Sequence, residues 1–265
     1  MKLSISNIAW TAENDSEIYA IMKKYGYEGL EIAPTRIFPE APYDNIENAR
    51  CWSQELKKKY GFVISSMQSI WFGRQEAIFG TDEERRILLD YTKKAIDFAA
   101  AIGCGNLVFG CPKNRNMPDG ANESFAIEFF RSIGNYAAEK GSVIGMEANP
   151  TIYNTNYINS TEQALELISR VNSTGFRLNL DVGTMIRNGE NVGILKGKVR
   201  LINHVHISEP YLKPICERFI HKELLRILAE ENYMGFVSIE MGKTDDIAEI
   251  SKSMEYIRAI ADSTL

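Results

Sequence analysis

Four acidic or histidine residues stand at or near the ends of four strand-like segments in the second half of the chain. They are Glu147 in VIGMEANP, Asp181 in FRLNLDVG, His206 in NHVHISEP and Glu240 in FVSIEMGK. The intervals between them are 34, 25 and 34 residues, about the length of one strand and one helix. Three carboxylates and one imidazole suit a divalent cation such as Mn²⁺, Mg²⁺, Co²⁺ or Zn²⁺. The spacing therefore predicts one mononuclear metal site.

Eight apolar or β-branched runs alternate with amphipathic stretches along the chain. The predicted strands cover residues 2–9, 29–33, 63–69, 106–111, 143–148, 176–181, 201–207 and 236–241. The predicted helices cover residues 15–25, 44–60, 82–102, 122–140, 161–172, 190–197, 219–232 and 245–262. This alternation predicts an α/β fold, a single (β/α)₈ barrel domain over residues 1–265. A doubly wound sheet is the alternative, but no GxGxxG, GxxxxGKS or GxxxxGKT motif follows any predicted strand.

The barrel gives the four residues a reason to converge. Reactive groups in this fold lie at the carboxyl-terminal ends of strands, and neighbouring strands are only about 4.8 Å apart. The alternative is that each acid caps the next helix or pairs with a lysine. Buried acids in a barrel mouth are costly without a cation, so four in succession favour the shared site. By two-residue alternation, Asn179 and His204 lie one layer deeper as candidates to orient the ligands. His204 is equally compatible with a core histidine, and Glu31 with either a structural acceptor or a wall of the site.

Polar and aromatic residues follow the predicted strands and are candidates to contact a ligand. An apolar platform with a few polar groups suits a small polyol or sugar. The candidates for substrate binding are Trp10, Gln68, Arg74, Lys113, Asn149, Glu209, Lys213 and His221, with Trp71, Tyr153 and Asn156 beside them. Lys113 and Arg115 in CPKNRN would either neutralise a phosphate or carboxylate or simply lie in solvent.

Composition excludes several classes of protein. The net charge of −5 and the pI near 5.4 give no electrostatic reason for binding nucleic acid or a membrane. No run of 18 apolar residues is present, and the N-terminal MKLSISNIAW lacks the pattern of a signal peptide. We expect a cytoplasmic protein. The four scattered cysteines form no CxxC pair and are expected to be plain thiols.

Several strand segments carry a family likeness. GYEGLEIAP, GMEANP, LNLDVGT, HVHISEP and YMGFVSIEM resemble the strand signatures of the xylose isomerase-like TIM-barrel superfamily, and the resemblance covers essentially the whole chain. It implies a sugar or sugar phosphate isomerase or epimerase with a carbohydrate substrate, and relatives are commonly dimers or tetramers. In the ketose 3-epimerase branch the metal ligands match Glu147, Asp181, His206 and Glu240. The resemblance makes Glu147 and Glu240 the catalytic acid/base pair, working through a metal-stabilised enediolate.

The chain also departs from that branch. Asp181-Val182-Gly183-Thr184 replaces a DxxH motif, Tyr153 stands where relatives often carry an acid, and the segment after the seventh strand reads His206-Ile207-Ser208-Glu209. Metal binding therefore transfers better than recognition of a free ketohexose. A metal-dependent dehydratase or lyase of the inosose type and a non-catalytic sugar-binding barrel are the alternatives. Endonuclease IV is rejected, because its zinc cluster needs more than the three histidines present and the acidic surface would repel DNA.

Overall fold

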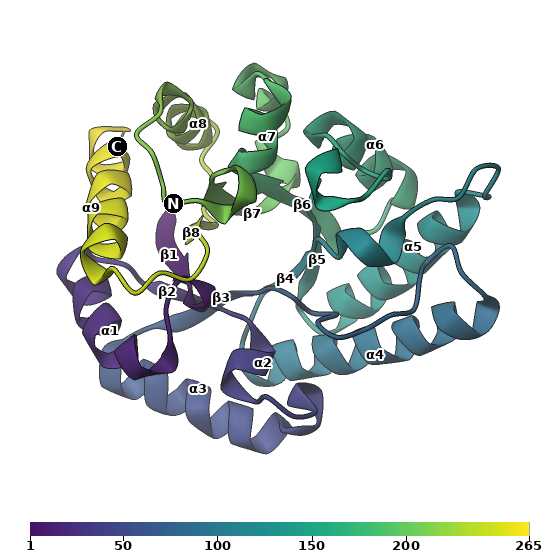
Figure 1. Cartoon of the computed structure of the whole chain (residues 1–265), viewed down its shortest axis with the longest axis horizontal. Helices are drawn as coiled ribbons and strands as arrows, with labels where there is room; N and C mark the ends of the chain where they lie inside the picture. Colours follow the sequence, from purple (N-terminus) through teal and green to yellow (C-terminus); the bar gives the residue numbers. More distant parts are fainter. Residues whose placement is uncertain (265) are drawn as a thin grey trace.

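The computed structural model describes residues 1–264 and shows a closed, parallel, eight-stranded barrel inside a ring of helices (Figure 1). Each strand pairs with the next in chain order, and β8 closes the barrel by pairing with β1. The strands are β1 Lys2–Ser6, β2 Gly29–Ile32, β3 Val63–Met67, β4 Asn106–Phe109, β5 Val143–Met146, β6 Phe176–Asp181, β7 Ile202–Ser208 and β8 Phe236–Glu240. The prediction of a (β/α)₈ barrel is confirmed.

The helices cover the outside of the barrel (Figure 1). They are α1 Asp15–Lys24, α2 Pro34–Ile37, α3 Ile46–Tyr60, α4 Asp82–Ala101, α5 Ser124–Glu139, α6 Thr161–Val171, α7 Val182–Asn188, α8 Phe219–Glu230 and α9 Ile247–Thr264. Short 3₁₀ turns lie at η1 Asn7–Ala9, η2 Ala12–Asn14, η3 Pro42–Asp44, η4 Pro112–Arg115, η5 Thr151–Tyr153, η6 Val192–Leu195, η7 Val199–Leu201 and η8 Pro210–Leu212. The first and last helices, α1 and α9, pack together and complete the ring. Within residues 1–264 we find no helix with the length and apolar character needed to cross a bilayer.

The helix predicted at residues 190–197 is wrong. The helix after β6 is α7, which begins immediately at the end of the strand because the Asp181 carboxylate caps it, accepting from the Thr184 backbone N–H at 2.6 Å. Gly189, with a left-handed φ of 66°, then ends α7. Only the 3₁₀ turn η6 remains inside the predicted range, within a segment interrupted by Gly193 and Gly197. Asp181, which the sequence predicted only as the end of a strand, therefore also caps a helix.

The first strand is shorter than its predicted range of 2–9. It ends at Ser6, and Asn7–Ala9 turn into η1. The buried Asn7 side chain accepts a hydrogen bond from the Ala33 backbone N–H at 2.9 Å. This bond ties the end of β1 to the short helix α2, which the sequence did not predict.

The inside of the barrel is polar, unlike the branched apolar layers usual in this fold. Asn106 of β4 donates to Asn179 of β6 at 3.3 Å, and His206 of β7 lies 2.9 Å from Glu31 of β2. These contacts join strands that are not neighbours, so the side chains must lie in the barrel interior. The apolar residues of the strands face outward and pack under the helices, where the main hydrophobic core lies. The interior thus forms a hydrogen-bonded floor beneath the carboxyl-terminal mouth.

Candidate metal centre

The four residues predicted as metal ligands meet at the carboxyl-terminal mouth of the barrel. Glu147 directly follows β5, whereas Asp181 and Glu240 end β6 and β8. His206 lies inside β7, two residues before its end. One ligand atom from each side chain lies within 4.8 Å of the other three. Ligands about 2.0–2.4 Å from one cation are spaced in this way, so the donor set fits a single divalent ion.

Burial makes ionisation of these clustered acids unfavourable in free energy unless a positive charge lies nearby. Desolvation, opposed by His206, raises the pKa of Glu240 to about 7. Desolvation and the nearby Glu147 charge raise the pKa of Asp181 above its ordinary value. Crowded carboxylates removed from water resist ionisation, and a cation relieves both the desolvation and the mutual repulsion. The chemistry of the donor set therefore favours an ion of the Mn²⁺, Mg²⁺, Co²⁺ or Zn²⁺ type.

His206 presents its two ring nitrogens to different partners. Nδ1 lies 2.9 Å from Glu147 Oε1 and 3.2 Å from Glu240 Oε2, whereas Nε2 lies 2.9 Å from Glu31 Oε2. Burial lowers the pKa of the imidazole, but the charges of Glu240 and Glu31 outweigh it and raise that pKa well above its usual value. With the Nε2 proton held by Glu31, Nδ1 is the nitrogen that would bind a cation after giving up its own proton.

Glu31 is fully buried beneath the cluster. Burial would raise its pKa, but the charge of His206, the hydrogen bond with His206 and the nearby His204 ring hold the pKa below its usual range. Gln68 Nε2 donates to Glu31 Oε1 at 3.1 Å. Of the two roles left open by the sequence, Glu31 takes that of a hydrogen-bond acceptor under the site. His204 Nε2 is 2.9 Å from the same Glu31 oxygen that His206 contacts, one layer below His206.

Two amide side chains fix the carboxylate of Glu147. Asn179 Nδ2 donates to Glu147 Oε1 at 3.0 Å, and Asn149 Nδ2 donates to Oε2 at 3.1 Å. Oε2 thereby keeps one bonding direction free for a cation or a proton, whereas Oε1 also lies 2.9 Å from His206 Nδ1. Asn179 lies where the alternation within β6 predicted a residue that orients the ligands.

Arg115 holds the Asn149 amide in one orientation. Its guanidinium is fully buried, and it donates to the Glu147 backbone carbonyl at 2.9 Å and to Asn149 Oδ1 at 2.8 Å. Because Oδ1 faces the arginine, the Asn149 amide must turn its NH₂ group toward Glu147. The hydrogen bonds of Arg115 therefore go to partners inside the protein. The sequence suggested either solvent or a ligand phosphate for this residue, and the structure places it in neither position.

The Asp181 carboxylate is held by one backbone N–H and one side-chain hydroxyl. Besides the bond from Thr184, it accepts a hydrogen bond from the Ser208 hydroxyl, which in turn accepts from the Gly183 N–H at 2.8 Å. Sequence reasoning did not single out Ser208. The signal was available, because Ser208 lies two residues after His206 on β7 and shares its inward face.

A small cavity of about 130 Å³ opens over three of the four predicted ligands. Its lining includes Glu147, Asp181 and Glu240, together with Pro112, Asn149, Tyr153, Ser208, Glu209 and Leu212. Two predicted substrate-binding residues, Asn149 and Glu209, thus lie at the cavity. Both oxygens of Glu209 accept from Arg218 at 2.6 Å, which anchors the segment after β7 beside the mouth.

Three further candidates lie close to the mouth in other surroundings. Gln68 is buried below the site, where it donates to Ser6 Oγ at 2.6 Å as well as to Glu31. Arg74 and Lys113 line a second hollow over β3 and β4. Arg74 is paired with Glu76, and Lys113 is exposed.

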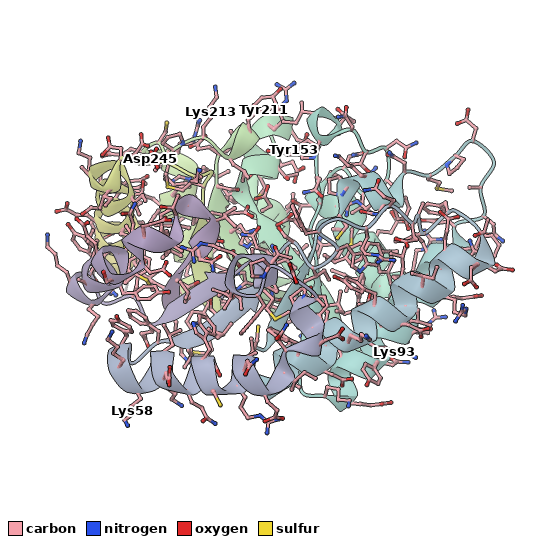
Figure 2. All side chains as sticks on the ribbon, turned by 60° about the horizontal axis from the view of Figure 1, so that its bottom comes forward. Lys58, Lys93, Tyr153, Tyr211, Lys213 and Asp245 are labelled. Atoms are coloured by element: carbon pink, nitrogen blue, oxygen red, sulfur yellow. The ribbon has the colours of Figure 1, made fainter. Side chains whose placement is uncertain are left out.

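The remaining candidates do not line the cavity. The buried Trp10 indole donates to Asp15 Oδ1 at 2.7 Å, under the Arg36 guanidinium. His221 is fully buried in α8, with Nδ1 3.1 Å from the Tyr256 hydroxyl. Lys213 is exposed and projects from the same edge of the molecule as Tyr153 and Tyr211, far from Lys58 at the opposite edge (Figure 2). The geometry thus gives Trp10 and His221 packing contacts.

Gly110 is a further residue that sequence reasoning missed. A Cβ at this position would lie 2.8 Å from Glu147 Oε2 and 3.4 Å from Asn149 Oδ1. The absence of a side chain after β4 therefore leaves room for the Glu147 carboxylate. A glycine directly after a barrel strand is the signal, since it marks a close approach of another group to the backbone.

The chain belongs to the xylose isomerase-like TIM barrel family, whose model matches residues 19–260. The resemblance seen in the strand segments is therefore confirmed.

Solved structures with this fold include 3-keto-D-glucoside 4-epimerase from E. coli, with a TM-score of 0.76 and 21% identity over 98% of this chain and 99% of that chain. D-psicose 3-epimerase from Clostridium cellulolyticum has a TM-score of 0.75 and 15% identity over 100% of this chain and 98% of that chain. L-ribulose 3-epimerase has a TM-score of 0.72 and 14% identity over 99% of this chain and 93% of that chain. At such identities the likeness shows the fold. No curated protein matches the chain.

Proposed function

We propose that the protein is a divalent-metal-dependent isomerase or epimerase of a sugar, sugar acid or sugar phosphate. The observation that carries the proposal is the meeting of Glu147, Asp181, His206 and Glu240 within 4.8 Å at the mouth of the barrel. Sugar epimerases among the structures with this fold, named for 3-keto-D-glucosides, D-psicose and L-ribulose, support a carbohydrate substrate.

In this proposal Glu147 and Glu240 exchange protons with the substrate. One glutamate takes the proton from the carbon beside a carbonyl, and the other returns a proton to that carbon or to its neighbour. Return to the other face of the same carbon is epimerisation. Return to the former carbonyl carbon, with a proton passing from the neighbouring hydroxyl to the carbonyl oxygen, is isomerisation. Asn149 and Asn179 serve this step by holding the Glu147 carboxylate in one orientation.

The same four side chains would hold the metal. A bound divalent ion supplies Lewis acidity toward the substrate carbonyl and the developing oxyanion, worth several kcal/mol. His206 offers Nδ1 while Glu31 holds Nε2, and Asp181 is fixed by Thr184. A homo-oligomeric assembly, which the family resemblance implies, remains part of the proposal.

The proposal is tested by isotope exchange in D₂O on a panel of ketoses, aldoses and their phosphates, with protein that has been chelated and then reloaded with each metal. We expect about one ion per chain and deuterium incorporation at one carbon beside the carbonyl. Glu147→Gln and Glu240→Gln should abolish exchange, whereas the exposed Glu55→Gln serves as the matched control.

The outcomes separate the alternatives. Loss of 18 mass units from a substrate would indicate a dehydratase. Absence of exchange across the whole panel, together with tight sugar binding, would favour a non-catalytic barrel. A protein that binds no ion and melts at the same temperature with and without chelator would contradict the proposed site.

A further inference from the structure

A second hollow opens beside the metal cavity. It has a volume of about 430 Å³ and lies over β3 and β4, where the segments 69–75 and 111–114 form its walls. Pro112 lines both hollows, so they are neighbours at the same mouth. The metal cavity, at about 130 Å³, is small beside the 300–1,000 Å³ of ordinary ligand sites, whereas the second hollow falls within that range.

The second hollow has an aromatic wall. Phe72 is 69% exposed, next to Trp71, which is buried. Trp71 Nε1 donates to Thr92 Oγ1 at 2.8 Å, and its ring packs edge-on against Phe109 at 4.7 Å. Trp71 is thus anchored inward, whereas the adjacent Phe72 is exposed. An exposed phenyl ring beside a cavity is a suitable platform for the apolar face of a sugar ring.

Polar groups surround the aromatic wall and are held in place. Arg74 Nε donates to Glu76 Oε2 at 3.0 Å, and its guanidinium lies 4.9 Å from the centre of the Tyr91 ring. Asn114 Nδ2 donates to the backbone carbonyl of Arg74 at 3.2 Å and to that of Glu76 at 2.8 Å. These bonds join the segment after β3 to the segment after β4, so both walls are formed before any ligand binds.

The backbone of both walls contains left-handed residues. Ser69 has φ 56° and Cys111 has φ 41°, and both line the hollow. Such conformations cost roughly 1–2 kcal/mol in residues other than glycine and cluster at ligand sites. Retention of this strain on both sides of one hollow is consistent with a built binding site.

The charges favour a neutral ligand over an anion. The charge of Arg74 is offset by Glu76, which leaves Lys113 as the cation among the lining residues without a carboxylate partner in the described chain. Arg115, the other basic residue of this segment, points inward to Asn149. Neutral hydroxyl groups suit donors and acceptors of this kind, whereas phosphate sites gather several cations or backbone N–H groups.

We infer that the hollow is a second sugar subsite, and that the substrate is a neutral glycoside whose reacting unit lies at the metal cavity and whose second ring stacks on Phe72. This inference rests on the proposed function and extends it. It assigns substrate specificity to the segment after β3, which contains none of the four proposed metal ligands.

The test compares D-fructose with D-fructose 6-phosphate and with three ketose disaccharides. These are maltulose, leucrose and isomaltulose, which carry a glucosyl group on O4, O5 and O6. Deuterium incorporation beside the carbonyl gives kcat/KM for each. We expect at least one of the disaccharides to exceed D-fructose by about tenfold or more, mainly through KM. Phe72→Ala should bring that ratio toward one, whereas Phe219→Ala, which removes a phenyl ring 74% exposed on α8, should leave it unchanged.

Equal rates for D-fructose and every disaccharide, or a preference for D-fructose 6-phosphate, would overturn the second subsite and leave the proposed function standing. Should none of these ketoses exchange, the wider panel decides the proposed function, and binding decides the subsite independently. Saturation-transfer NMR on chelated protein with isomaltulose should then show contacts to the glucosyl ring that Phe72→Ala removes and Phe219→Ala retains. Absence of those contacts would also overturn the inference.

Discussion

Glu31 Oε2 lies 2.9 Å from His206 Nε2, on the side of the imidazole opposite the acids of the cavity. The two residues are 175 positions apart in sequence and come from β2 and β7, across the barrel from one another. A carboxylate that accepts the far proton of a ligating histidine fixes its tautomer and raises its basicity. The polar floor of the barrel therefore contacts the candidate metal site through Glu31, as it does through Asn179, which donates to Glu147.

Replacement of Glu31 by glutamine should weaken metal binding. The neutral amide is a poorer acceptor for His206 Nε2–H, and loss of such a partner typically lowers metal affinity by about 10–100-fold. Competition with a chromophoric chelator measures the affinity. Glu28→Gln, an exposed change three residues earlier, is the control and should bind metal normally. Equal affinity in all three proteins would contradict the role of Glu31.

Gly110→Ala should damage the site while leaving the fold in place. The new Cβ would lie 2.8 Å from Glu147 Oε2 and would push that carboxylate away from His206. We expect loss of metal affinity and of isotope exchange by about tenfold or more. Gly105→Ala, just before the same strand β4, is the matched control because nothing lies within 4 Å of its added Cβ. If Gly110→Ala binds metal as well as Gly105→Ala does, the close approach has no functional consequence.

Arg115→Lys should lower the free energy of unfolding. It should also lower metal affinity, because Asn149 would no longer be held against Glu147. Lysine keeps the charge but lacks the planar fork that reaches the Glu147 carbonyl and Asn149 Oδ1 together. A buried acceptor left without its donor costs about 1–3 kcal/mol, which urea unfolding can measure.

Arg187→Lys, on the exposed face of α7, is the control for Arg115→Lys and should unfold like the native protein. In a double-mutant cycle on metal affinity, Asn149→Ala should remove most of the effect of Arg115→Lys, because the arginine acts through that amide. Additive effects of the two changes would show that Arg115 acts independently of Asn149.

His221 should make stability depend on pH. Its burial, partly opposed by Glu209, lowers the pKa to about 4. A histidine whose folded pKa lies below its unfolded value of about 6.5 stabilises the fold above pH 6.5 and loses that contribution as pH falls toward 4. From pH 7.5 to pH 5 the native protein should lose about 2 kcal/mol from this residue.

The measurement is urea unfolding at both pH values for the native protein and for His221→Asn. The variant removes the titrating ring, so its stability should fall less over the same interval. Any loss of the contact with Tyr256 lowers stability equally at both pH values and leaves the difference readable. Identical pH dependence in the two proteins would show that His221 is not held neutral.

The sequence determined the barrel and the proposed metal ligands because both follow from local, repeating patterns. Eight apolar runs alternate with amphipathic stretches, and a residue at the end of one strand meets residues at the ends of its neighbours as a consequence of parallel pairing. Glu147, Asp181, His206 and Glu240 could therefore be placed together without coordinates. The helix predicted at 190–197 failed for a local reason as well, since Asp181 caps α7 directly at the strand end.

Tertiary structure alone decided which polar side chains support those ligands. Arg115 stands in a polar segment that reads as solvated, yet it turns inward to the Glu147 carbonyl and Asn149, 32 and 34 residues away. His221 and Trp10 are polar-tipped residues whose direction no periodicity fixes, and both are buried in contacts of their own. The physical reason is that a long side chain can satisfy its hydrogen bonds in water or in the protein, and only the packed chain determines which partners come within reach.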